Sequence, residues 1–214
     1  NRFTWTPGPG APANLVAAMR HSVFPAGARV RPRLCLAVAR ACGEDQPAVS
    51  DAAAAAIELL HCASLVHDDL PCFDDALLRR GRPSVHRAYG ERVAVLTGDA
   101  LIVLAFQTLA RVGEHSPQRL AALLPVVTRC VGSPGGIVAG QAWECEPQVS
   151  LRDYQRAKTG ALFAAAAMAG AGAAGTDPAG WHDFGERLGE AFQVADDLRD
   201  VAASQEEIGK PVHR

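Results

Sequence analysis

Long segments rich in alanine and leucine follow one another along this chain and favour an all-helical fold. Both residues have high intrinsic helix propensity, so an extended run of them is typical of a helix. Little in the sequence supports strands. The segments expected to be helices are 52–66, 93–111, 118–131, 151–170 and 184–201.

Helix starts and connections are also marked in the sequence. Asp51 and Ser150 precede two of the expected helices and are candidate N-caps, because their side-chain oxygens can accept hydrogen bonds from free backbone amides. Glycine and proline separate the helices in short stretches, none long enough for a domain linker, and no repeat of fixed period is present. We therefore expect a single all-α domain over residues 1–214, built as a helical bundle.

Composition narrows the class of protein. Hydrophobic residues make up 49% of the 214 residues, enough for one sizeable core, and the net charge of −2 argues against nucleic acid as the main partner. No segment approaches the roughly 20 uninterrupted apolar residues that a transmembrane segment needs. The six cysteines form no CxxC pair and lie in apolar or helical segments. This usage is typical of buried thiols in a reducing compartment, so we expect a cytoplasmic protein.

An acidic cluster follows the first expected helix. Asp68, Asp69, Asp74 and Asp75 lie close together, and Pro71 is expected to end the regular helix between them. Like charges at the C-terminal end of a helix are unfavourable unless a cation binds there. Carboxylate oxygens suit Mg²⁺, whose coordination is often completed by substrate phosphates. Taken alone, this segment could also be an acidic turn exposed to solvent.

A second acidic cluster lies in the last expected helix. Spacings of three, four and seven place Gln193, Asp196 or Asp197, and Asp200 along one helix face. Such a face cannot enter a core unless its charges are neutralised. Two aspartate pairs on opposite sides of one cavity could hold several metal ions with a diphosphate between them. One helix of this kind could simply be a solvent-exposed surface. Two helical segments with the same aspartate pair are harder to explain in that way.

These clusters belong to a series of short motifs that occur in a recognisable order. They are DDLPCFD at 68–74, LRRG at 78–81, GDA at 98–100, GQ at 140–141, KTG at 158–160 and QVADDLRD at 193–200. Over roughly residues 21–214 this series resembles the trans-isoprenyl diphosphate synthases. The resemblance implies that family's helical bundle around a central cavity, here without its C-terminal helices, and a homodimer.

The resemblance also implies roles for particular residues. A magnesium site with two or three ions would use Asp68, Asp74, Asp196 and Asp200, with Asp69, Asp75 and Asp197 in support. The allylic diphosphate would be bound by Arg79, Lys158, Thr159, Gln193 and Lys210. Isopentenyl diphosphate would be bound by Arg31, His61 and Arg80. Arginine suits these roles because its guanidinium group binds phosphate oxygens in a bidentate manner.

The implied reaction is metal-assisted prenyl transfer. The allylic C–O bond ionises, the double bond of isopentenyl diphosphate attacks the cation, and the departing diphosphate accepts the proton that is lost. Chain length in the family depends on residues about one turn before the first aspartate, which here are the small Ala63 and Ser64. Farnesyl diphosphate synthases place an aromatic residue there, so we expect geranylgeranyl diphosphate as the product. Ala63 and Ser64 could also be small because helices pack closely at this point.

One departure from the family pattern affects the isopentenyl diphosphate side. The family usually shows GGKRLRP near its N-terminus, whereas residues 26–32 of this chain read AGARVRP. Ala28 therefore replaces a lysine, and Arg29 is expected to supply part of the missing charge. The alternatives that stay open are a farnesyl or geranyl diphosphate synthase and a non-catalytic subunit of a prenyl synthase.

Overall fold

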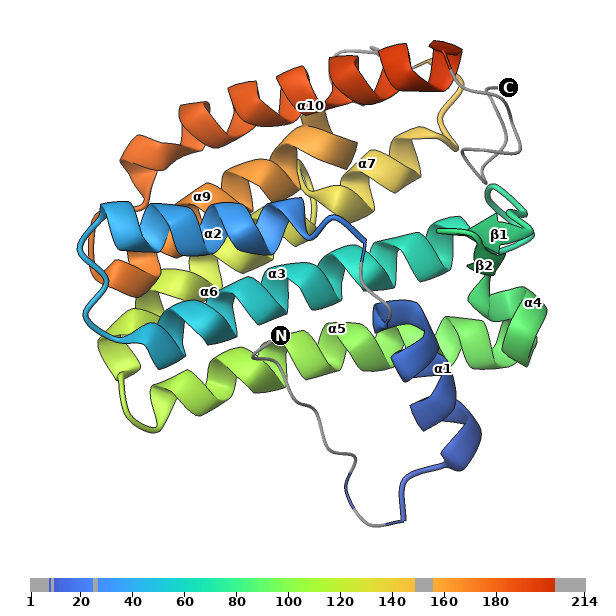
Figure 1. Ribbon diagram of the computed structural model, residues 1–214, viewed down its shortest axis with the longest axis horizontal. Helices are drawn as coiled ribbons and strands as arrows, with labels where there is room; N and C mark the ends of the chain where they lie inside the picture. The colour runs from blue at the N-terminus through green and yellow to red at the C-terminus, as the bar shows by residue number, and fades with distance from the viewer. Residues whose placement is uncertain (1–7, 9, 25–26, 149–155, 203–214) are drawn as a thin grey trace. The chain divides into compact units, whose positions relative to one another are not determined.

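The structure is a computed structural model that describes residues 8, 10–24, 27–148 and 156–202. Helices dominate this part of the chain (Figure 1), so the all-α prediction is confirmed. The only strands among the described residues form a short antiparallel pair, β1 (Leu78–Arg79) and β2 (Arg82–Pro83). The chain forms two compact units, and the expected single domain stays a prediction. The first unit contains 1–28, 59–103 and 195–214, and the second contains 29–58 and 104–194.

The helices follow the alanine-rich segments closely. In chain order they are α1 (Ala13–Val23), α2 (Val30–Ala41), α3 (Pro47–Asp68), α4 (Val85–Tyr89), α5 (Glu91–Gly113), α6 (Pro117–Val131), α7 (Ile137–Trp143), the π-helix η1 (Arg156–Gly160), α9 (Ala161–Ala174), the 3-10 helix η2 (Ala179–Trp181) and α10 (His182–Ala202). The expected N-cap at Asp51 is wrong, because α3 already begins at Pro47. Proline fits the first turn of a helix, because the N–H groups of that turn have no hydrogen-bond partner within the helix and proline lacks this group. The other expected cap, Ser150, lies outside the described residues.

The core of the second unit is built around α9. Every residue of this helix is buried, and both α2 and α6 pack against it (Figure 1). A helix that is apolar on all sides is stable only when it is surrounded, and alanine lets the neighbouring helices come close. A Cβ atom at Gly170 would lie 3.0 Å from the Cβ atom of Val38, so α2 approaches α9 where a side chain is absent.

In the first unit, α1 packs against α4, and the turn between β1 and β2 carries Arg80 and Gly81. Both turn residues have positive φ, 54° and 73°. This is the backbone of a two-residue hairpin turn that matches the twist of the flanking strands. This hairpin could not be predicted from the sequence, because its strands are too short for an alternating pattern.

Among the described residues, two helices are long and apolar enough to cross a membrane. Helices α3 and α5 meet the length and hydropathy requirements for crossing a membrane, with 67% and 39% of their apolar windows buried. Buried core helices meet the same requirements, so these two are weak evidence for a span.

The expectation that the cysteines are buried holds for Cys35, Cys62 and Cys130, but it is wrong for Cys72 and Cys145, which are exposed. Both lie in turns that follow helix ends.

Candidate active site

The first acidic cluster forms a tight loop at the end of α3. The backbone amide of Asp74 donates a hydrogen bond to the carbonyl oxygen of Asp68 at 2.9 Å, so the loop returns to the helix end. Asp68 and Asp69 are 8% and 2% exposed, respectively. A solvated acidic turn therefore does not describe Asp68 and Asp69, although Asp74 and Asp75, farther along the loop, are exposed. The loop holds the first and last aspartates of the motif at one end of the helix.

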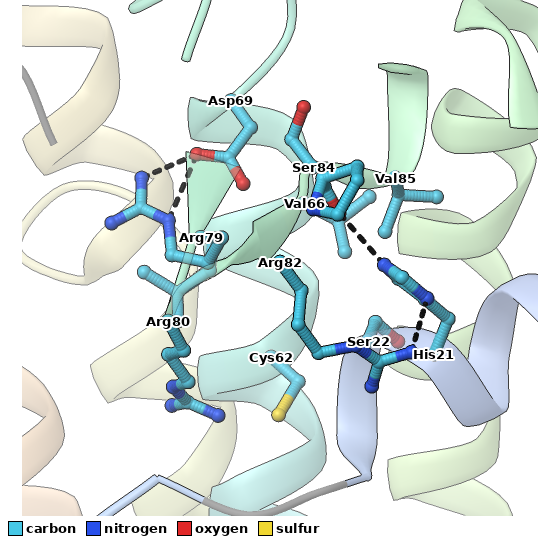
Figure 2. Close-up of a pocket in the computed structure, with 12 residues that line it drawn as sticks. His21, Ser22, Cys62, Val66, Asp69, Arg79, Arg80, Arg82, Ser84 and Val85 are labelled. Carbon is cyan, nitrogen blue, oxygen red and sulfur yellow. Dashed lines mark hydrogen bonds and ion pairs between the residues drawn. The ribbon is translucent and has the colours of Figure 1, made fainter. Parts of the chain in front are cut away.

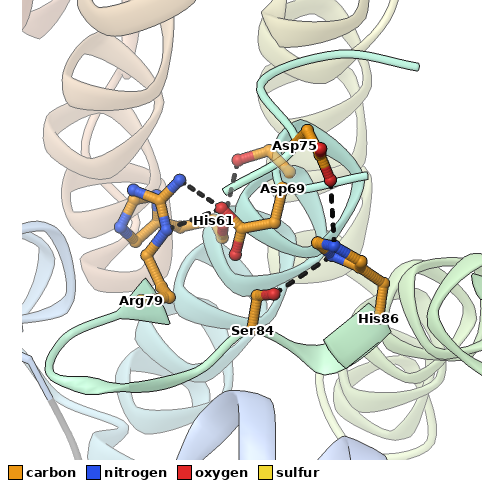
Figure 3. Close-up of polar contacts among 7 residues, drawn as sticks. His61, Asp69, Asp75, Arg79, Ser84 and His86 are labelled. Carbon is orange, nitrogen blue, oxygen red and sulfur yellow. Dashed lines mark hydrogen bonds and ion pairs between the residues drawn. The ribbon is translucent and has the colours of Figure 1, made fainter. Parts of the chain in front are cut away.

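Arg79 on β1 orients Asp69. Its Nε atom donates to Oδ1 of Asp69 at 2.9 Å, and its Nη2 atom donates to the same oxygen (Figure 3). Burial raises the pKa of Asp69 despite the opposing effect of Arg79. Burial also acts to lower the pKa of Arg79, but the hydrogen bond and charge of Asp69 outweigh it and the pKa is raised. Arg79 is therefore a permanent cation beside a carboxylate that is costly to leave unpaired.

A pocket beside this ion pair is rich in arginine (Figure 2). Its polar lining includes His21, Cys62, Asp69, Arg79, Arg80, Arg82 and Ser84. Three guanidinium groups outnumber the single carboxylate, so the pocket suits an anionic ligand. His21 and Arg82 were not predicted as site residues, because neither belongs to a motif and they come together only in the folded chain. Arg82 donates to the carbonyl oxygen of Phe24 at 2.8 Å, and its Nη2 atom lies 2.9 Å from Nδ1 of His21.

The expected chain-length residues lie on α3. Ala63 is fully buried, and Ser64 is half-buried with its hydroxyl donating to the carbonyl oxygen of His61 at 2.9 Å. His61 itself is half-buried. Ser64 is thus satisfied within its own helix and presents little polarity to its surroundings.

Two motifs of the second unit pack directly on each other. A Cβ atom at Gly140 would lie 2.7 Å from the backbone nitrogen of Lys158, so the GQ motif on α7 and the KTG motif on η1 meet where no side chain intervenes. Thr159 donates a 2.7 Å hydrogen bond to Oε1 of Gln193 on α10, and Lys158 pairs with Glu144. Single π-helical turns occur frequently at functional sites. The structure therefore brings together Lys158, Thr159 and Gln193, which the sequence separates by up to 35 residues.

Arg29, which follows the missing lysine, is paired with a carboxylate. Its guanidinium group forms an ion pair with Glu58 of α3, and the two side chains are only 18% and 9% exposed. This ion pair joins the start of α2 to α3. The expectation that Arg29 supplies part of the lost charge stays a prediction. Its partner Glu58 lies 29 residues away, so spacing along the sequence does not reveal the pairing.

The structure describes only some of the side chains in the second acidic cluster. Asp196 and Asp197 on α10 are half-buried, and their segment belongs to the same compact unit as Asp68 and Asp74. The side chain of Asp200 and all of Lys210 lie outside the described residues.

A profile of the polyprenyl synthetase family matches residues 12–214. The chain belongs to the polyprenyl synthetase family. It is 58% identical to a geranylgeranyl diphosphate synthase of Cereibacter sphaeroides over 95% of this chain and 71% of that protein. It is 55% identical to a geranylgeranyl diphosphate synthase of Rhodobacter capsulatus over 94% of this chain and 70% of that protein.

A solved structure agrees with the fold. A geranyltransferase of Helicobacter pylori, complexed with magnesium and isoprenyl diphosphate, superposes with a TM-score of 0.84 at 34% identity. The match covers 99% of this chain and 74% of that chain. The family match and the high sequence identity to the two synthases show that this protein is a trans-prenyltransferase that elongates prenyl chains. This confirms the prediction made from the motifs.

Proposed function

We propose that this enzyme joins isopentenyl diphosphate to an allylic diphosphate and releases the twenty-carbon geranylgeranyl diphosphate. The proposal rests on one observation, the loop in which the Asp74 amide donates to the Asp68 carbonyl oxygen beside an arginine-rich pocket. This arrangement pairs a hard-cation site with an anion site. The small residues Ala63 and Ser64, together with the two geranylgeranyl diphosphate synthase relatives, favour the twenty-carbon product.

The donor set fits magnesium. Asp68 and Asp74 offer carboxylate oxygens, which are the ligands that Mg²⁺ prefers, and the loop brings their backbones together. Asp196 and Asp200 are proposed as the second pair of ligands, for two or three ions in total. Bound magnesium would offset the charge of the diphosphate as it leaves the allylic carbon.

The chain's own cations bind and orient the substrates. Arg79, held by Asp69, is proposed to bind the allylic diphosphate, and Arg80 on the adjacent turn to bind isopentenyl diphosphate. Their charges offset the negative charge that develops on the diphosphate when the allylic C–O bond breaks. The new carbon–carbon bond then forms from the double bond of isopentenyl diphosphate, and the released diphosphate accepts the proton.

The polar residues of the second unit have a proposed role on the allylic side. The hydrogen bond from Thr159 occupies Oε1 of Gln193 and fixes the direction of its amide. A fixed amide dipole stabilises developing charge without reorganising during the reaction. Lys158 adds a cation close by in sequence, and Lys210 is proposed to act with it.

Assembly and location are also proposed. Helix α5 exposes Val95, Leu96 and Val103 by 43%, 56% and 55%, and an apolar helix face of this kind supports a homodimer. The six cysteines are free thiols, which supports a reducing, cytoplasmic location.

Product analysis tests the proposal. The protein is incubated with Mg²⁺, labelled isopentenyl diphosphate and five-, ten- or fifteen-carbon allylic diphosphates, and the products are sized by chromatography. We expect a twenty-carbon product. Asp68→Asn should lower the rate at least about a hundredfold, because several kcal/mol of charge stabilisation depend on the metal. Asp177→Asn, at an exposed carboxylate whose hydrogen bond from the amide of Ala179 an asparagine can also accept, is the matched control.

Other products would change the conclusion. A fifteen-carbon product from the wild type would keep the reaction but overturn the role of Ala63 and Ser64. No turnover with any starter would favour a non-catalytic subunit. Ser64→Phe should stop elongation at fifteen carbons, whereas Ser64→Ala should still give twenty.

A further inference from the structure

The loop after α3 ends at a residue with an unusual backbone conformation. Asp75 has a φ of 45°, in the left-handed region that few residues other than glycine adopt. Its amide donates to the carbonyl oxygen of Leu70 at 3.1 Å. Asp75 directly follows the proposed metal ligand Asp74, so the conformation of Asp75 decides where Asp74 can lie. Whatever holds Asp75 therefore also holds Asp74.

Two side chains of α4, those of His86 and Arg87, lie close to the carboxylate of Asp75, and Figure 3 shows the contact with His86. Nη2 of Arg87 donates to its Oδ1 atom at 3.1 Å, and Nε2 of His86 lies 3.4 Å from the same oxygen. The Arg87 side chain is 44% exposed, whereas that of His86 is 3% exposed. Exposed ion pairs such as the one with Arg87 contribute little stability. The Nε2 atom of His86 is buried and has no hydrogen-bond partner in this structure, so the Asp75 oxygen at 3.4 Å, on a side chain that is 53% exposed, is the acceptor that a small shift would bring within range.

Ser84 orients the His86 ring. Its Oγ atom lies 3.1 Å from Nδ1 of His86, and both residues are buried. When the hydroxyl donates to Nδ1, the proton of the neutral imidazole is on Nε2 and faces Asp75. The amide of Ser84 donates to the carbonyl oxygen of Leu77 at 3.0 Å, which fixes the start of α4. Ser84, His86 and Asp75 thus form a chain from α4 to the aspartate loop.

We propose that His86 is a positioning residue for magnesium binding. By holding Asp75 in its left-handed conformation, it keeps the Asp74 carboxylate in place beside Asp68. His86 touches neither substrate nor metal in this account. The inference rests on the proposed metal site, and it adds a residue outside both aspartate motifs to that site.

The test measures magnesium affinity as well as rate. Thermal melting of the full chain is followed as Mg²⁺ is titrated at constant inorganic diphosphate, and the rate of prenyl transfer is measured over the same range. In His86→Ala the half-saturating Mg²⁺ concentration should rise about tenfold in both experiments, as is typical when support of a metal ligand is lost. The rate at saturating Mg²⁺ should fall much less.

Matched variants separate positioning from general stability. His86→Gln keeps an amide that can donate toward Asp75, so it should recover part of the affinity. His115→Ala changes an exposed histidine between α5 and α6 and should leave the Mg²⁺ dependence unchanged. A His86→Ala protein that melts earlier but keeps the wild-type half-saturating concentration would show a purely structural role and overturn the inference. A wild type that does not respond to Mg²⁺ would instead overturn the metal site itself.

Discussion

The guanidinium group of Arg31 lies over the ring of Phe163, with its central carbon 4.7 Å from the ring centroid. The ring of Phe192 is 5.9 Å away, and the two rings are 5.1 Å apart. Helices α2, α9 and α10 each supply one of these residues. A planar guanidinium group stacks on an aromatic face in a way that an ammonium group does not. The aromatic pair therefore fixes the residue that we expect to bind isopentenyl diphosphate.

Arg31→Lys should weaken binding of isopentenyl diphosphate while keeping the positive charge. Loss of the stacking and of the bidentate geometry should raise the KM for this substrate about tenfold, equivalent to about 1.4 kcal/mol. The KM for the allylic substrate should change little. Steady-state kinetics with each substrate varied in turn measures both. Arg33→Lys changes an exposed arginine on the same helix and is the control; equal effects in the two variants would contradict the assignment.

Gly27→Ala should disturb Arg80. A Cβ atom at Gly27 would lie 2.7 Å from both Nε and Cζ of Arg80, so the guanidinium group must move. We expect a severalfold higher KM for isopentenyl diphosphate, because a displaced guanidinium group loses its alignment with phosphate oxygens. Gly180→Ala, where no atom lies within 4 Å of the added carbon, provides the comparison. An unchanged KM in Gly27→Ala would show that Arg80 does not need this position.

Gly170→Ala should destabilise the second unit. The added carbon would meet the carbonyl oxygen of Cys35 and lie 3.1 Å from the amide nitrogen of Ala39, both in the backbone of α2. Overpacking of this kind costs about 1–3 kcal/mol. At Gly172 in the same helix the nearest atom is Cγ of Pro178 at 3.3 Å, so Gly172→Ala should be close to neutral. Urea denaturation compares the two, and equal stabilities would rule out close packing at Gly170.

The Cys35 thiol should make stability depend on pH in the alkaline range. Burial raises the pKa of Cys35 from 9.0 to about 12. The folded chain therefore keeps a proton that the unfolded chain loses, so this contribution is complete below pH 9 and falls as the pH rises toward 12. By pH 10 the loss should be about 1.4 kcal/mol.

Two measurements check the Cys35 prediction. The free energy of unfolding is compared between pH 8 and pH 10, and Cys35→Ala should lose less stability over this range than the wild type or Cys72→Ala. Alkylation of the native protein at pH 8 should label the exposed Cys72 and Cys145 before Cys35. Rapid labelling of Cys35 would mean that its surroundings open readily.

Several features of the fold were predictable because their causes are local. The alanine-rich segments predicted α3, α5, α6 and α10 to within a few residues, since helix propensity acts through neighbouring residues. The fourth segment was less well predicted. Its described part is the π-helix η1 followed by α9, which continues to Ala174. The backbone of η1 lies in close contact with α7 and α10, so tertiary packing as well as helix propensity determines its conformation.

The amino-acid sequence by itself determined the helical class, the two acidic clusters and the family, because composition, spacing and motif order can be read along the chain. The tertiary structure alone decided which partners the charged residues take. Arg29 pairs with Glu58, Arg31 stacks on Phe163, and His86 reaches Asp75. These pairings join residues that lie 29, 132 and 11 positions apart. They depend on how helices and loops pack, and no local pattern in the sequence encodes that packing.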